Sequence, residues 1–118
     1  MKYMMIVLLE FYPSWLALSR EVRQEKAMEL RHITLKYDKD VKVRFFDAEA
    51  LPGETYTDFV MCETEDLRPY HFMWEEIRDS ETYTRGYMKI KNVIMGIENA
   101  YQLYESEILA KPPALAEE

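Results

Sequence analysis

The sequence predicts an α+β fold in which four antiparallel strands form one sheet and two helices cover one of its faces. Two observations support this prediction. The expected elements follow one another as strand, helix, strand, strand, helix and strand. In addition, the first strand is apolar on both of its faces, which is more apolar surface than helices on one side of a sheet can cover.

The first half of the chain is predicted to contain strand, helix and strand. Residues 3–10 have the length and the Val and Ile content of a strand, and Pro13 ends it. A short apolar turn or helical piece follows at residues 15–18. Ser19 then stands in the N-cap position of a helix that runs to about Lys36. One side of this helix carries the apolar residues Val22, Ala27, Leu30, Ile33 and Tyr37.

The second expected strand, residues 41–49, alternates regularly in its side chains. One face carries Val41, Val43 and Phe45, and the other carries Lys42, Arg44 and Phe46. A turn is expected at Leu51-Pro52-Gly53-Glu54, and a third strand at residues 57–64.

The second half of the chain is predicted to repeat the pattern of helix and strand. Asp66 precedes a helix with Pro69 in its first turn. Its apolar stripe falls at i, i+3, i+4 and i+7, on Tyr70, Met73, Trp74 and Ile77. A connector at residues 79–86, a fourth strand at 87–97 and a short last helix at 98–107 complete the expected elements.

This order is that of the ferredoxin-like βαββαβ fold, a four-stranded antiparallel sheet with both helices on one face. We expect one domain over residues 1–108 and a mobile C-terminal tail over residues 109–118. The alternation leaves open which set of the first strand faces the helices. That set is either Met4, Ile6 and Leu8 or Met5, Val7 and Leu9.

The apolar face that the helices leave open needs a cover. The simplest cover is the same face of a second copy, related by a two-fold axis, which makes a homodimer of the dimeric α+β barrel type. The alternative is that the C-terminal segment from Glu98 onward folds over the open face of its own sheet.

Composition excludes several kinds of partner. A net charge of −7 repels phosphate backbones, so we expect no nucleic acid partner, and no run reaches the ~18 apolar residues of a membrane helix. The single cysteine, Cys62, makes no internal disulfide and is expected as a buried inert thiol in a soluble cytoplasmic protein. Two histidines and one cysteine without ligand spacing predict no metal site, and no motif predicts a cofactor.

A few residues are candidates for chemistry, although no catalytic set is established. His71, with Glu75 and Arg78 nearby, is a candidate general base or haem ligand, or a surface histidine with charged neighbours. Arg44 and Asp58 are candidates for a charge pair across the second and third strands, inside a site or at the sheet edge. Aromatic candidates for a flat ligand, or for simple core packing, are Tyr12, Trp15, Tyr56, Trp74 and Tyr83.

Several motifs resemble the darcynin family over nearly the whole chain. They are Trp15-Leu16-Ala17-Leu18-Ser19-Arg20-Glu21 with Arg23, Thr57-Asp58-Phe59, Ile77-Arg78-Asp79-Ser80, Tyr83-Thr84 with Tyr87, and Val93-Ile94 with Gly96-Ile97-Glu98. The resemblance implies a small bacterial protein of unknown function. The family is similar in style to dimeric α+β barrel proteins, which include chlorite-dismutase-like haem proteins and small cofactor-free monooxygenases. It implies a dimer but no catalytic residues.

These observations favour a dimeric barrel that binds a small apolar or aromatic molecule. The alternative is a small monooxygenase-like or haem-dependent enzyme with its site in the barrel cavity. Its candidate catalytic residues are Arg44, Asp58, His71 and Tyr83, and His71 is the candidate axial ligand of a haem. A third possibility is a module whose apolar face binds a different protein.

Overall fold

The structure, a computed structural model, describes residues 1–48 and 56–109. Its elements are, in order, β1 (Tyr3–Phe11), α1 (Pro13–Leu16), α2 (Arg20–Lys36), β2 (Val41–Asp47), β3 (Asp58–Thr64), α3 (Leu67–Asp79), α4 (Glu81–Thr84), β4 (Met88–Ile97) and α5 (Ala100–Glu107). The predicted order is confirmed, and the connector after α3 contains the additional short helix α4. The turn expected at residues 51–54 and the tail residues 110–118 lie outside the described residues.

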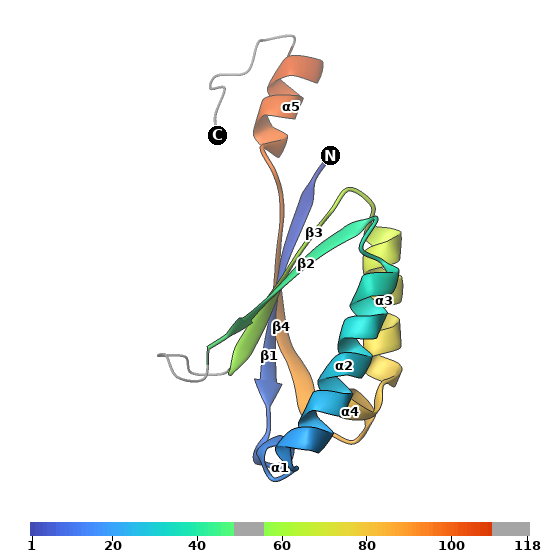
Figure 1. The fold of residues 1–118 in the computed structure, drawn as a ribbon. Helices are drawn as coiled ribbons and strands as arrows, with labels where there is room; N and C mark the ends of the chain where they lie inside the picture. The colour runs from blue at the N-terminus through green and yellow to red at the C-terminus, as the bar shows by residue number, and fades with distance from the viewer. Residues whose placement is uncertain (49–55, 110–118) are drawn as a thin grey trace.

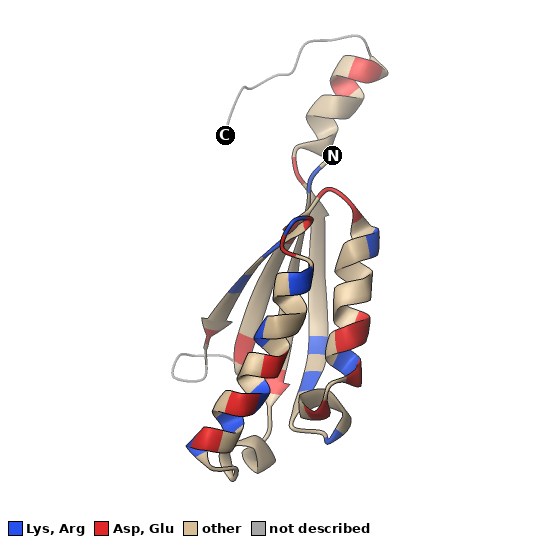
Figure 2. Ribbon diagram, turned by 45° about the vertical axis from the view of Figure 1, so that its right-hand side comes forward, with Lys and Arg blue, Asp and Glu red and all other residues tan. Residues whose placement is uncertain are grey.

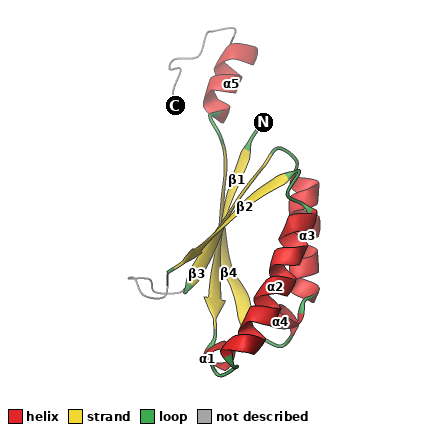
Figure 3. Cartoon of the chain, viewed as in Figure 1, coloured by secondary structure: helices red, strands yellow, loops and turns green. Residues whose placement is uncertain are grey.

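The four strands form one antiparallel sheet in the order β2-β3-β1-β4. β1 is therefore a central strand with a partner on each side, while β2 and β4 are the edges. Figures 1 and 3 show α2, α3 and α4 on one side of this sheet, with no helix on the other. The thinnest dimension of the molecule is 18 Å, which fits one sheet and one layer of helices.

The orientation of β1 is settled by its burial. Met5, Val7 and Leu9 point toward the helices and are almost completely buried. Their core partners are Val60 and Cys62 of β3, Met73, Trp74 and Ile77 of α3, and Met88 of β4. The alternate set of β1, Met4, Ile6 and Leu8, therefore lies on the face that no helix covers.

Helix α3 forms as its sequence pattern predicts. The Asp66 side chain accepts a hydrogen bond from the Arg68 backbone N–H at 3.0 Å and so caps the helix. The predicted apolar stripe faces the sheet, with Met73, Trp74 and Ile77 buried.

Helix α2 is less apolar on its inner side than predicted. Its N-cap, Ser19, accepts from the Val22 backbone N–H as expected, but Ile33 is the one buried residue of the helix. Ala27, expected in the apolar stripe, is exposed instead. The inward position is taken by Lys26, one residue earlier, whose ammonium group forms an ion pair with Glu81 of α4. A rotation of 100° per residue then turns Ala27 outward.

The C-terminal helix does not fold over the open face. Figure 1 shows α5 continuing beyond the end of the sheet, along the long axis of the molecule, which measures 58 Å. None of its residues is buried. The alternative in which the segment from Glu98 covers its own sheet is therefore wrong for the described residues, up to position 109. Among those residues, no helix is long and apolar enough to cross a membrane.

Candidate binding face

The sheet face opposite the helices is the main candidate for a functional surface. Directly paired residues of antiparallel strands point to the same side, so the register identifies its members. We call this surface the open face; its apolar members are Met4, Ile6, Leu8, Phe46, Phe59, Met61 and Ile94. All are at least partly exposed in this chain, and Ile94 is 55% exposed. Contiguous apolar surface of this kind marks an interface or a ligand site.

Two phenylalanines stack at one side of the open face. Phe46 of β2 and Phe59 of β3 are register partners. Their ring centroids lie 4.8 Å apart, and the angle between the ring planes is 12°. The Arg44 guanidinium lies 5.1 Å from the centroid of the Phe46 ring. A stacked aromatic pair beside a cation can hold a flat ring and neutralise an anionic substituent on it.

Ion pairs bound the apolar part of the open face at its two ends. Lys2 and Glu63 lie 3.1 Å apart at one end, and Lys91 and Glu10 lie 3.2 Å apart at the other. An apolar centre with a charged rim is the usual composition of a protein interface.

The predicted pair of Arg44 and Asp58 does not form. Arg44 is the register partner of Met61 on the open face, whereas Asp58 is the register partner of Leu9 on the helix side. Asp58 is 4% exposed, and its carboxylate accepts a hydrogen bond from the Thr57 hydroxyl. The two charges are thus on opposite faces of the sheet. In this register Asp58 pairs with Asp47, three positions from Arg44 on β2, and an odd number of positions along a strand leads to the opposite face.

His71 is a surface residue with charged neighbours at helical spacing. Its imidazole lies 3.3 Å from the Glu75 carboxylate, which also lies 3.7 Å from the Arg78 guanidinium. All three side chains are at least half exposed on α3. The interpretation of His71 as a surface histidine is therefore the one that its surroundings favour, and the imidazole does not face the sheet.

Two of the aromatic candidates, Tyr12 and Trp15, lie beyond the end of β1. Trp15 packs 5.2 Å from Phe11 and 6.1 Å from Tyr87, at the end of the sheet where β1 meets α1. Tyr12 lies beside them, and its backbone N–H donates to the Tyr87 carbonyl at 3.0 Å. The ring contacts favour the core-packing interpretation of Trp15.

Two further aromatic candidates pack against the core, whereas Tyr56 is partly buried just before β3. Tyr83 of α4 is partly buried against the core, and the cations of Arg78 and Lys89 lie 6.0 and 5.7 Å from the centroid of its ring. Trp74 is buried in α3, and its indole interacts with the thiol of Cys62. Neither residue contributes to the open face.

Cys62 is buried and chemically quiet, as predicted. Cys62 lies on the helix side of β3 and is completely inaccessible to solvent. Burial raises the pKa of the Cys62 thiol from 9.0 to about 12, against a smaller lowering by the neighbouring Trp74 indole. A neutral buried thiol is neither a nucleophile nor a metal ligand at physiological pH. Within the described residues, no three His, Cys, Asp or Glu side chains lie close enough to hold a metal ion.

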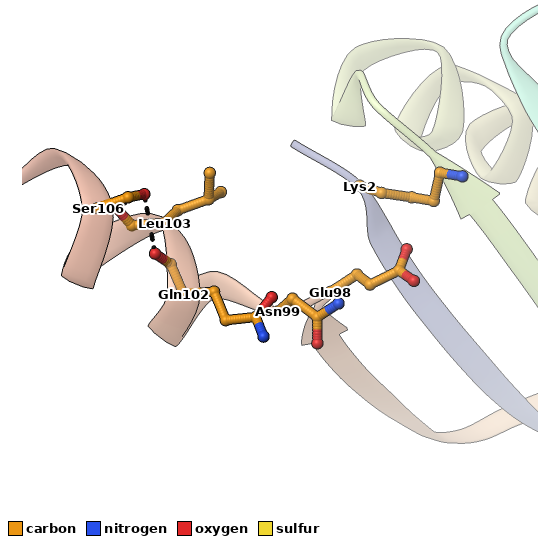
Figure 4. Close-up of a pocket in the computed structure, with 6 residues that line it drawn as sticks. All are labelled: Lys2, Glu98, Asn99, Gln102, Leu103 and Ser106. Atoms are coloured by element: carbon orange, nitrogen blue, oxygen red, sulfur yellow. Dashed lines mark hydrogen bonds between the residues drawn. The ribbon is translucent and has the colours of Figure 1, made fainter. Parts of the chain in front are cut away.

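An open groove of about 300 Å³ separates α5 from the beginning of β1. Figure 4 shows its lining residues, Lys2, Glu98, Asn99, Gln102, Leu103 and Ser106. Gln102, Leu103 and Ser106 mark the side of α5 that faces its own sheet across the groove, and this side is largely polar.

The sequence did not single out Phe46 and Phe59 as a pair. The alternation of the second strand correctly placed Phe46 with Lys42 and Arg44. What was missing was the register between the strands, which depends on the loop that joins them.

Comparison with known proteins assigns the chain to a family. The family model described as "Darcynin, domain of unknown function" matches residues 2–111. The chain belongs to the darcynin family. Darcynin 1 of Acinetobacter baumannii is 41% identical over 92 residues, which are 77% of this chain and 100% of that protein. Darcynin of Chromobacterium violaceum is 29% identical over 69 residues, which are 58% of this chain and 86% of that protein. The resemblance seen in the sequence is thus confirmed.

Solved structures with the same fold include a larger enzyme. Chlorite dismutase from Candidatus Nitrospira defluvii, in complex with imidazole, matches with a TM-score of 0.72 and 10% sequence identity. The match covers 80% of this chain and 39% of that chain. At this identity the likeness shows the shared fold, and the darcynin chain spans about two fifths of the enzyme's length.

Proposed function

We propose that this darcynin is one half of a homodimeric α+β barrel in which the open faces of two copies meet and bind a small apolar or aromatic molecule. The observation that carries the proposal is the open face itself. Seven apolar side chains lie together on a sheet surface that no described residue of the chain covers. Burying a large apolar side chain is worth roughly 1.5–3 kcal/mol, so leaving several in water is unfavourable.

A second copy suits this face better than an unrelated protein does. An isologous contact needs only one self-complementary surface, and an apolar centre with ion pairs at both ends is such a surface. The length of the structural neighbour is consistent with this: the aligned unit is 39% of that chain, so a second unit of equal size would fit in the remainder.

The ligand class follows from the stacked rings on the open face. Phe46 and Phe59 offer parallel ring surfaces, and the Arg44 guanidinium beside them offers a positive charge. We therefore propose an aromatic molecule, with preference for one that carries an anionic group.

The dimer is tested by placing a charge in the middle of the open face. Ile6→Lys should convert the protein from a species of twice the 14.2 kDa chain mass to a single chain, measured by light scattering at micromolar concentration. Met28→Lys is the matched control, since Met28 is exposed on the outer side of α2. If Ile6→Lys leaves the mass unchanged, the open face is not the interface.

The ligand is tested with a fluorescent anionic aromatic probe, 8-anilinonaphthalene-1-sulfonate. We expect saturable binding that weakens by about tenfold or more in Phe59→Ala and in Arg44→Ala, because each removes one side of the proposed site. Phe45→Ala serves as the control, since Phe45 lies on the same strand as Arg44, β2, but on the opposite face of the sheet. Equal binding by all variants would rule out this site.

The second candidate is a haem-dependent or monooxygenase-like enzyme, and its support is the fold shared with chlorite dismutase. The residues do not fit an imidazole-ligated haem on the open face. The chain has two histidines, and both His32 and His71 are exposed on helices on the other side of the sheet. Titration with haemin is the test: a sharp Soret band that is lost in His71→Ala would restore this candidate.

A further inference from the structure

The outer half of β4 and the helix α5 leave a second apolar surface uncovered. We call this segment, residues 93–109, the arm. Eight of its large apolar residues are between 41% and 67% exposed, whereas Leu103 lines the groove toward the sheet; the eight are Val93, Ile94, Met95, Ile97, Tyr101, Tyr104, Ile108 and Leu109. Figure 2 shows no charged residue in the outer half of β4, where the sequence reads Asn92-Val93-Ile94-Met95-Gly96-Ile97. The outer half of β4 is thus an edge strand without the charges that protect such edges, and the acidic residues of the arm, Glu98, Glu105 and Glu107, all lie beyond it.

Part of the arm lies on the helix side of the sheet. Val93 and Met95 are register partners of Val7 and Met5, which belong to the buried core. They therefore point to the side of the helices, yet α2 and α3 do not extend far enough to cover them. A partner that lies flat on the open face cannot reach Val93 and Met95, because they project from the opposite side of the sheet.

The helix α5 carries an apolar stripe that faces away from its own body. Tyr101, Tyr104 and Ile108 are spaced at i, i+3 and i+7 and share one side of the helix. At 100° per residue this side is about half a turn from Leu103 and Ser106, which line the groove toward the sheet. Because α5 continues past the end of β4, its stripe does not reach Val93 and Met95 of the same chain (Figure 1).

We propose that two copies exchange their arms, so that the α5 stripe of each copy seats on the uncovered strip of Val93, Met95 and Ile97 on β4 of the other. The inference rests on the proposed homodimer and extends it around the edge of the sheet. A two-fold axis makes such a contact reciprocal, and each of the two unpartnered apolar surfaces then covers the other.

The size of the arm agrees with this occupant. Without Ile94, which belongs to the open face, seven large side chains, each about half exposed and roughly 180 Å² in full, present roughly 600 Å². A standard interface buries about 800 Å² on each partner. The arm therefore supplies nearly a complete interface in addition to the open face, which is more than a small ligand can cover.

Disulfide trapping in the full chain tests the exchange. The double variant Met95→Cys/Tyr104→Cys should form a covalent species of twice the chain mass under mild oxidation, and neither single variant should do so to the same extent. Met28→Cys/Tyr104→Cys is the matched control, since Met28 lies on the outer side of α2. The native Cys62 does not interfere because it is buried.

Three results are distinguishable. A disulfide between chains in the double variant alone supports the exchange. If the wild-type protein is a dimer but the disulfide forms within one chain or not at all, the arm exchange is wrong while the open-face dimer stands. If the wild-type protein is a single chain at micromolar concentration, both proposals are wrong.

A charge in the stripe provides a second, independent measurement. Tyr101→Glu/Tyr104→Glu should weaken dimerisation by at least about tenfold, because it places charges in a contact that must exclude water. Both side chains are about half exposed in the single chain, so the variant is expected to fold. An unchanged dimer dissociation constant would overturn the exchange.

Discussion

Met5 and Met95 are register partners on neighbouring antiparallel strands, yet Met5 is completely buried and Met95 is 58% exposed. Both side chains point to the helix side of the sheet. The difference arises because the helices cover β1 and β3 but leave the outer half of the edge strand β4 bare. Two chemically identical side chains, side by side, therefore have different roles in this fold.

Truncating each methionine should separate these roles. Met5→Ala should lower the free energy of unfolding by about 2–5 kcal/mol, because it leaves a cavity in the core. Met95→Ala should instead act on the dimer, raising its dissociation constant while changing monomer stability by less than about 0.5 kcal/mol. Urea unfolding at several protein concentrations distinguishes the two. Equal losses that do not depend on concentration would contradict the assignment of Met95 to an interface.

Arg44 and Asp58 should be energetically independent. Because the sheet separates them, the effects of Arg44→Ala and Asp58→Ala on the free energy of unfolding should add to within about 0.5 kcal/mol in the double variant. We expect the larger loss from Asp58→Ala, since the aspartate is buried and the arginine is exposed. A double-mutant cycle by urea denaturation measures this, and a coupling above about 1 kcal/mol would imply that the two charges do interact.

Stability should fall in alkaline solution because of Cys62. Burial raises the pKa of its thiol from 9.0 to about 12, so between these values the unfolded chain has lost a proton that the native chain retains. The contribution of the Cys62 thiol to the free energy of unfolding is fully present below pH 9 and is lost as the pH rises toward 12. Between pH 8 and 10.5 the free energy of unfolding should fall by on the order of 1–2 kcal/mol. Urea unfolding at these two pH values measures it. Cys62→Ala should show a smaller decrease, and an identical pH dependence would contradict the assignment.

Asn99 should set the direction of the arm. It has a φ of 52° just before α5, a left-handed conformation that glycine and asparagine tolerate and β-branched residues resist. Asn99→Gly should therefore keep dimer affinity within a few-fold, whereas Asn99→Val should weaken it, as measured by sedimentation. The same affinity in both variants would mean that the orientation of α5 does not matter for assembly.

The sequence predicts much of this fold because its local signals are strong. The stripe of α3 from Tyr70 to Ile77, the caps at Ser19 and Asp66, and the alternation from Val41 to Phe46 each determine an element without help from the rest of the chain. The excess of apolar residues in β1 likewise indicates an uncovered face.

The rest depends on relations between elements, which one sequence does not reveal. The pairing of Phe46 with Phe59, and the separation of Arg44 from Asp58, follow from strand register. Ala27 is exposed because α2 is rotated so that Lys26 points inward, where it forms an ion pair with Glu81. The exposure of Met95 follows from where the helices end, which no pattern within β4 encodes.

The central claim is that the open face and the arm are covered by a second copy of the chain. Sedimentation equilibrium of the unmodified protein over a wide range of concentrations tests it most directly. We expect twice the 14.2 kDa chain mass at micromolar concentration, with dissociation only on strong dilution. A mass of 14.2 kDa throughout this range would contradict it.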